Sequence, residues 1–143
     1  MPAFTLTGNI PGSAAAAAVG LQPQTIDAGV SVQIGTGITA AAGSGNTPQT
    51  PCFCLQTRLD GGDRSLLIVP EPNGTVTTLT VNLLVSYDGG ATWQVFGTSG
   101  AMGGAPLQAA EFKNLPAGAL FSLACATLVL GTATSLNLAG SVS

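Results

Sequence analysis

Residues 75–87 read TVTTLTVNLLVSY, and this stretch decides the class of fold. Its apolar and polar residues alternate, with Leu79, Val81, Leu83 and Val85 set against Thr78, Thr80 and Asn82. Successive side chains on a β-strand point to opposite faces, so this alternation is typical of a strand that buries one face. The stretch therefore predicts a long strand with one face in a core.

Shorter alternating or apolar stretches lie on both sides of this one, separated by turns rich in Gly, Asp, Asn and Pro. The further strands predicted from them span residues 4–7, 26–34, 52–59, 65–69, 92–96, 110–113, 120–130 and 134–142. Many short strands without intervening helices are typical of antiparallel sandwiches and barrels. We therefore expect an all-β protein, an antiparallel β-sandwich of the jelly-roll or Ig-like kind, with about eight strands.

The chain of 143 residues is expected to form one domain preceded by an arm. The β-sandwich takes residues 25–143. Residues 1–24 contain no charged side chain and no regular pattern, yet they carry several large apolar residues, namely Phe4, Leu6, Ile10, Val19 and Leu21. Such a segment is too apolar to be left in water, so we expect an extended arm that lies across a neighbouring subunit.

The segment 36–51 is a second stretch that does not fit a compact sheet. It is rich in Ala, Gly, Ser, Thr and Pro and has no charge. Loops longer than about 12–15 residues in compact domains are usually functional or disordered. Ordering of this loop against a neighbouring subunit is the favoured interpretation, and a plain flexible loop is the alternative.

Charged residues are few. The chain has three basic and six acidic residues, and its charged fraction is 6%, against about 25% in a typical domain. Three basic residues cannot supply the electrostatic footprint of a nucleic-acid-binding protein. No apolar run is long enough to span a bilayer, and no basic face suits an interfacial helix. A neutral surface gives little protection against self-association, so we expect a homo-oligomer or larger assembly, with a neutral secreted monomer as the alternative.

The residues needed for common catalytic and metal sites are missing from the sequence. There is no histidine, which excludes Ser-His-Asp and Cys-His arrangements. Cys52, Cys54 and Cys125 do not have zinc-ligand spacing, so we expect reduced, buried thiols. The turn 60–63, Asp-Gly-Gly-Asp, lacks the distal ligand of a calcium loop and is flanked by two arginines, which favours a charged turn. No catalytic residue, cofactor or metal is expected.

Residues 86–93 read SYDGGATW and form the most distinctive motif, S-x-D-x-G-x-T-W, through Ser86, Asp88, Gly90, Thr92 and Trp93. The Asp can close an Asx-turn, glycines tolerate positive φ, and the Trp is expected to pack under the turn. The motif resembles the Asp-box, a hairpin repeated in sialidases and other β-propellers and found singly in β-sandwich proteins. The resemblance implies a structural turn away from any catalytic centre. A sugar- or ion-binding tip is the alternative.

A propeller is excluded on length, because it needs about four or more blades of four strands each and the motif occurs here once. The N-terminus, Met1–Thr5, has no positively charged n-region of a signal peptide, so synthesis and retention in a cytoplasm are expected.

A short chain without a signal peptide, a Gly/Ala/Thr-rich β-sandwich, very few charges and an extended arm together resemble the structural proteins of bacteriophage particles, above all capsid decoration or cement proteins. The resemblance implies location in the virion after synthesis in a host cytoplasm. It also implies contact with the major capsid protein or other virion subunits and a homo-oligomer, most often a trimer. Two alternatives remain: a phage tail or fibre subunit, and a carbohydrate-binding module, for which Tyr87 is the best exposed aromatic.

Overall fold

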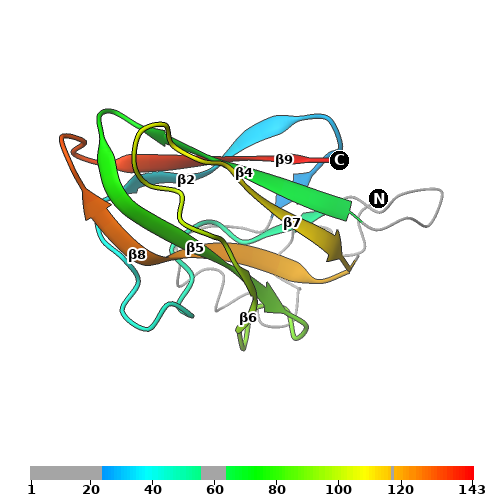
Figure 1. Cartoon of the computed structure of the whole chain (residues 1–143). Coiled ribbons are helices and arrows are strands. Elements are labelled where there is room, and N and C mark those ends of the chain that lie inside the picture. Colours follow the sequence, from blue (N-terminus) through cyan, green and yellow to red (C-terminus); the bar gives the residue numbers. More distant parts are fainter. Residues whose placement is uncertain (1–23, 56–63, 117) are drawn as a thin grey trace.

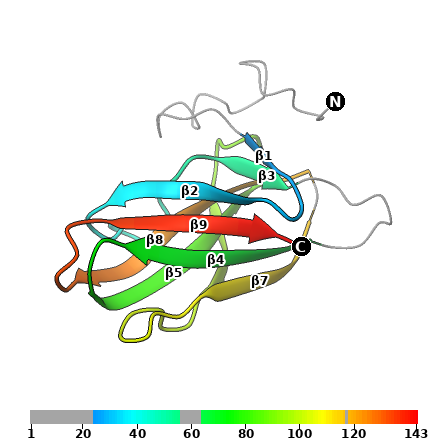
Figure 2. The same cartoon turned by 90° about the horizontal axis from the view of Figure 1, so that it is seen from above.

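The computed structural model describes residues 24–55, 64–116 and 118–143, and these residues form nine strands and no helix (Figure 1). The strands are β1 (Gln24–Ile26), β2 (Ser31–Ile38), β3 (Phe53–Leu55), β4 (Arg64–Pro72), β5 (Val76–Ser86), β6 (Gln94–Thr98), β7 (Ala110–Leu115), β8 (Leu120–Leu130) and β9 (Leu136–Val142). They make a five-stranded sheet in the order β1-β3-β8-β5-β6 and a four-stranded sheet in the order β2-β9-β4-β7. The two sheets face each other, as Figures 1 and 2 show, which confirms the predicted β-sandwich.

The inner face of strand β5 is as the sequence predicts, whereas Asn82, Leu84 and Ser86 on its other face are buried as well. It pairs with β8 along its whole length, and Leu79, Val81 and Leu83 are completely buried between the sheets. The facing residues of the four-stranded sheet include Leu66 and Ile68, which are also fully buried. One continuous core therefore fills the space between the sheets.

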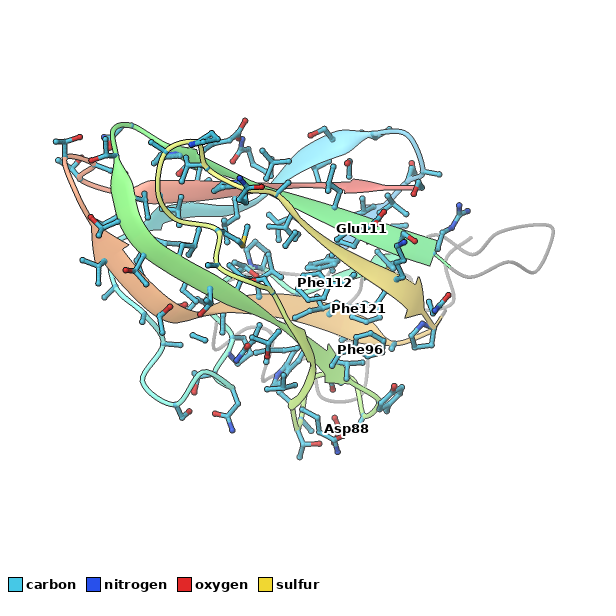
Figure 3. All side chains as sticks on the ribbon, viewed as in Figure 1. Asp88, Phe96, Glu111, Phe112 and Phe121 are labelled. Carbon is cyan, nitrogen blue, oxygen red and sulfur yellow. The ribbon has the colours of Figure 1, made fainter. Side chains whose placement is uncertain are left out.

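Aromatic rings close one side of this core. Phe121 on β8 stacks against Phe53 with ring centroids 6.0 Å apart, and it meets Phe96 on β6 edge-on at 6.5 Å. Figure 3 shows Phe112, Phe121 and Phe96 one below another between the two sheets, on the side where β7 and β6 are the outermost strands. Aromatic pairs at these separations and angles are favourable beyond their buried area.

The single strand predicted for residues 26–34 is wrong. The chain leaves the five-stranded sheet after β1 and enters the other sheet at β2, and Gly29 between them has a φ of 79°. Ala28 forms a parallel bridge with Val142, and the Gly29 amide donates to the Val142 carbonyl at 2.8 Å. A positive φ is accessible to glycine at little cost, so the chain can turn here.

The sandwich is also not wholly antiparallel. Strand β1 pairs with β3 in parallel, with Gln24 opposite Phe53 and Ile26 opposite Leu55. The remaining strand pairs are antiparallel. The predicted antiparallel sandwich therefore has one parallel strand pair, at an edge of the five-stranded sheet.

Strand β4 extends beyond the predicted residues 65–69 and includes Pro70 and Pro72. Pro70 and Pro72 lie opposite Leu138 and Leu136 of β9. The amides of Ser65 and Ser143 bond each other's carbonyls, which places the odd-numbered backbone groups of β4 on the β9 side. The proline nitrogens therefore point toward β7, whose pairing with β4 ends at Ile68, and no ladder bond is lost.

Candidate functional site

Two of the regions singled out in the sequence lie outside the described residues. The arm residues Phe4, Leu6, Ile10, Val19 and Leu21, and the strand predicted at 4–7, fall within residues 1–23. The Asp60–Asp63 turn falls within residues 56–63. The hairpin 86–93 is described in full.

The hairpin turn is held by its own side chains. The hydroxyl of Ser86 donates to Oδ1 of Asp88 at 2.7 Å and accepts the Gly90 amide at 2.8 Å. The Thr92 amide donates to the same Oδ1 at 2.9 Å, and the Thr92 hydroxyl donates to Oδ2 at 2.5 Å. Gly89 and Gly90 have φ of 73° and 97°, values that other residues rarely adopt. Four of the five residues predicted as a structural turn, namely Ser86, Asp88, Gly90 and Thr92, are thus joined by hydrogen bonds.

These donors stabilise the charged form of Asp88. The hydrogen bonds from the Thr92 hydroxyl and amide, followed by that from Ser86, lower the pKa of Asp88 to about 2. Both carboxylate oxygens already accept hydrogen bonds from within the turn. A cation or sugar hydroxyl would have to compete with these donors, so the geometry is that of a structural turn.

The two aromatic residues of the hairpin differ in exposure. Tyr87 is 68% exposed. Trp93 is partly buried and packs on the outer face of the five-stranded sheet against Leu84, Ala124 and Ala42. Packing of Trp93 was predicted, but the indole is only partly enclosed.

The segment 39–52, here called the covering loop, lies against the five-stranded sheet of the same chain. The amides of Ala42 and Gln49 donate to the carbonyls of Cys125 and Leu123 on β8, each at 2.9 Å. The amides of the same two β8 residues donate to side-chain oxygens of the loop: Gln49 Oε1 accepts the Cys125 amide at 2.6 Å, and Thr50 Oγ1 accepts the Leu123 amide at 2.9 Å. The loop thus continues the β8 edge beyond β3, and its order needs no neighbouring subunit.

The covering loop also covers part of the outer face of the five-stranded sheet. Asn82 on β5 donates to the Gly45 carbonyl at 2.7 Å and accepts the Thr98 hydroxyl at 2.8 Å. The fully buried Thr50 and Ser122 bond each other. The sequence signal for these contacts was the presence of polar residues among the apolar ones of this loop and of β8. Nothing in the sequence indicated that these polar residues bond each other.

The three cysteines are buried thiols, as predicted. Burial raises the pKa of the Cys52 and Cys125 thiols to about 11. Burial also raises the pKa of Cys54, although a hydrogen bond with Thr25 at 3.2 Å opposes the shift. Thiols in this state are poor nucleophiles and poor metal ligands at neutral pH.

Figure 2 looks onto the outer face of the four-stranded sheet, here called the open face, and no described strand or loop crosses over it. Leu67 and Val69 on β4 are 38% and 37% exposed at its centre. Their cross-strand neighbours on β9 are Ser141 and Ala139. On the β7 side, Leu67 lies opposite Glu111.

Other features of the described residues offer little for a ligand. An open depression of about 290 Å³ is lined by residues 36–41 and Gln49 and contains no charged side chain. Among residues 24–55, 64–116 and 118–143, no group of three His, Cys, Asp or Glu side chains is placed to hold a metal ion. The same residues include no helix that is long and apolar enough to cross a membrane.

Comparisons with known proteins add a distant likeness of shape. No protein-family model matches the chain, and no curated protein matches it in sequence. Among solved structures, the chain is similar to PliG of Aeromonas hydrophila, a periplasmic inhibitor of g-type lysozyme. The two are 11% identical with a TM-score of 0.41, over 85% of this chain and 97% of PliG.

Proposed function

We propose that the chain is a structural subunit of a virus particle, a capsid decoration or other head-associated protein, and that it acts through protein–protein contacts without catalysing a reaction. The observation that carries this proposal is the open face, with the apolar side chains of Leu67 and Val69 exposed at its centre. Contiguous exposed apolar groups rimmed by polar ones mark interaction surfaces.

The chemistry of this face suits attachment to another protein. Burying a charge without a partner is costly, whereas burying hydroxyl and apolar groups costs little when they find contacts. Each apolar Å² removed from water contributes about 25 cal/mol. A particle shell repeats the same subunit surface many times, so a modest contact is multiplied over the shell.

The test is sedimentation of tagged protein with particles of the virus that encodes the chain. Leu67→Thr combined with Val69→Thr keeps strand-compatible residues and removes apolar area from the open face. The matched control is Val129→Thr, which alters an apolar side chain 53% exposed on β8 of the other sheet. We expect the double variant to lose most of its attachment and the control to keep it.

The N-terminal arm gives a second comparison in the same assay. Deletion of residues 1–23 leaves β1 intact, and we expect the β-domain to stay folded while attachment weakens. A full-length protein that is absent from particles and does not sediment with them would overturn the proposal.

One observation favours the carbohydrate-binding alternative. Tyr87 projects beside the ordered Asp88 turn and is 68% exposed. A glycan array probed with wild-type protein and with Tyr87→Ala tests it: glycan binding that is lost in the variant would support that function in place of shell attachment.

A further inference from the structure

Strand β7 is an edge of the four-stranded sheet, and β4 is its neighbour there. Ser65 and Ser143 exchange backbone bonds, so the even-numbered groups of β4 point toward β7. Leu66 and Ile68 of β4 lie opposite Phe112 and Ala110. The amides and carbonyls of these two β7 residues therefore point inward, and those of Glu111 point away from the sheet.

The side chains of β7 alternate in the same way. Phe112 points into the core and is 7% exposed. Glu111 and Lys113 share the outer face, with Lys113 Nζ and Glu111 Oε1 3.5 Å apart and side chains 46% and 69% exposed for Glu111 and Lys113 respectively. Figure 3 shows Glu111 and Phe112 in this arrangement.

These charges are notable because the chain has so few. Its net charge is −3 with only three basic residues, and one of the three sits two positions from a carboxylate on a sheet edge. Charged side chains on an edge strand, above all Lys, are one way in which proteins hinder its pairing with another strand. The two opposite charges flanking Phe112 are self-complementary. After a second copy of the strand is rotated by 180° about an axis beside Phe112, each Glu faces a Lys.

We propose that β7 pairs in antiparallel fashion with β7 of a second copy of this chain, about a twofold axis beside Phe112. Glu111 then lies opposite Lys113 of the second copy, and Lys113 opposite its Glu111. The outward backbone groups of Glu111 gain partners across the axis, and the two four-stranded sheets become continuous. This contact is isologous, the commonest arrangement in homo-oligomers.

A second copy of β7 fits this edge better than the opposite edge of the same sheet. Strand β2 reads SVQIGTGI and has no charged residue, so pairing of β7 with β2 of another copy would leave Glu111 and Lys113 unmatched. Phe96, 38% exposed, lies on the same side of the sandwich as β7, which adds apolar surface beside the contact.

This inference rests on the proposed function, since it specifies how an assembly subunit meets its own copy. The twofold contact makes a dimer, in place of the trimer that the virion resemblance implies. Its test uses the free full-length chain, so its failure is distinguishable from failure of particle attachment. A dimer that does not bind particles would overturn the function and leave this contact standing, and particle binding by a monomer would do the reverse.

The experiment is sedimentation equilibrium of the full-length chain and two charge reversals. Glu111→Lys places lysines opposite each other across the axis, and Lys113→Glu places glutamates there. Like charges directly opposite on paired strands are destabilising, so each variant should weaken the dimer by about tenfold or more. Circular dichroism checks that both exposed substitutions leave the fold unchanged.

Mixing the two variants is the decisive measurement. A heterodimer of Glu111→Lys with Lys113→Glu has complementary charges at both positions, so it should form with close to wild-type affinity although neither variant dimerises well alone. The ion pair within one chain cannot produce this rescue, because neither variant contains it. A wild-type monomer at all concentrations, an oligomer insensitive to either reversal, or a mixture that forms no heterodimer would overturn the proposal.

Discussion

The hairpin 86–93 and the covering loop 39–52 are both held by hydrogen bonds between side chains and the backbone, but the bonded residues lie at very different separations in the sequence. In both, side-chain oxygens accept backbone amides that no regular strand partner reaches. In the hairpin, donor and acceptor are at most four residues apart. In the covering loop, Gln49 and Thr50 bond residues 72 to 76 positions away.

The two regions differ in how far their hydrogen bonds are buried from water. The hairpin turn is exposed at Asp88, and its bonds compete with water. Thr50 and Ser122 are completely buried, so a lost bond leaves a polar group with no alternative partner. Substitutions in the covering loop should therefore cost more than similar ones in the hairpin.

The largest effect is expected for Thr50→Val. The substitution keeps the shape but removes the acceptor of the Leu123 amide, which is left buried without that partner, while the Ser122 hydroxyl keeps its bond to the Thr50 carbonyl. We expect a loss of about 2–3 kcal/mol in the free energy of unfolding, measured by urea denaturation. The control is Thr80→Val, whose exposed hydroxyl bonds Thr127 at 2.8 Å. Equal losses at the two sites would contradict the comparison.

Trp93→Ala is expected to come next, since this side chain joins the two regions. Its indole belongs to the hairpin but packs on Ala42 of the covering loop and on Leu84. Because the ring is only partly buried, the cost should fall below the range for a fully buried Trp, at about 2 kcal/mol. Hydrogen exchange should show faster opening of the covering loop in this variant. Unchanged exchange there would mean that the ring does not hold the loop.

A smaller effect is expected for Gly90→Ala. The φ of 97° at this position is strained for a residue with a Cβ, and the loss should be about 1–2 kcal/mol. Gly43→Ala in the covering loop is the matched control, since a Cβ there meets no atom within 4 Å. The denaturation midpoint should move for Gly90→Ala and stay in place for Gly43→Ala.

The smallest effect is a pH dependence of stability that arises from Asp88 in the hairpin. The pKa of Asp88 is lowered from 3.8 to about 2, so the folded state binds this proton less readily than the unfolded state. Its stabilisation is complete above about pH 4 and is lost as the pH falls through about 2. Wild-type protein should lose stability over this window more steeply than Asp88→Asn.

Thr92→Val removes the hydroxyl that contributes most to the shift, so NMR titration should find a higher pKa for Asp88 in that variant. A pKa of Asp88 that does not change on removal of this hydroxyl would contradict the assignment of its cause.

The same contrast explains which features the sequence could predict. The hairpin motif was readable because its residues bond within a few positions of one another, and the strand at 76–86 because alternation is a local property. The place of the covering loop on β8 was not readable, since no local pattern links Gln49 to Cys125. The change of sheet at Gly29 was missed for a related reason: the apolar alternation of residues 26–34 continues across it, and only the position of Val142 shows that the strand has ended.

The two proposed contact surfaces, the open face and the edge at β7, could likewise be predicted from the sequence only in part. The scarcity of charge is a property of composition and predicted an assembling protein. The exposure of Leu67 and Val69 depended on the open face having no described segment packed over it, which strand patterns do not reveal. The self-complementarity of Glu111 and Lys113 became visible only once β7 was known to be an edge.

The strand order has a consequence for the protein during its synthesis. In the four-stranded sheet, β9 separates β2 from β4, and in the five-stranded sheet, β8 separates β3 from β5. Residues 120–142 leave the ribosome after all the strands they join, so until then β2, β3 and β4 lack a neighbour on the side that β8 or β9 will occupy. The β5–β6 hairpin can form early, but its apolar inner face stays uncovered meanwhile. The nascent chain is therefore most exposed to aggregation just before β8 and β9 emerge, and the sandwich can close only after both have left the ribosome.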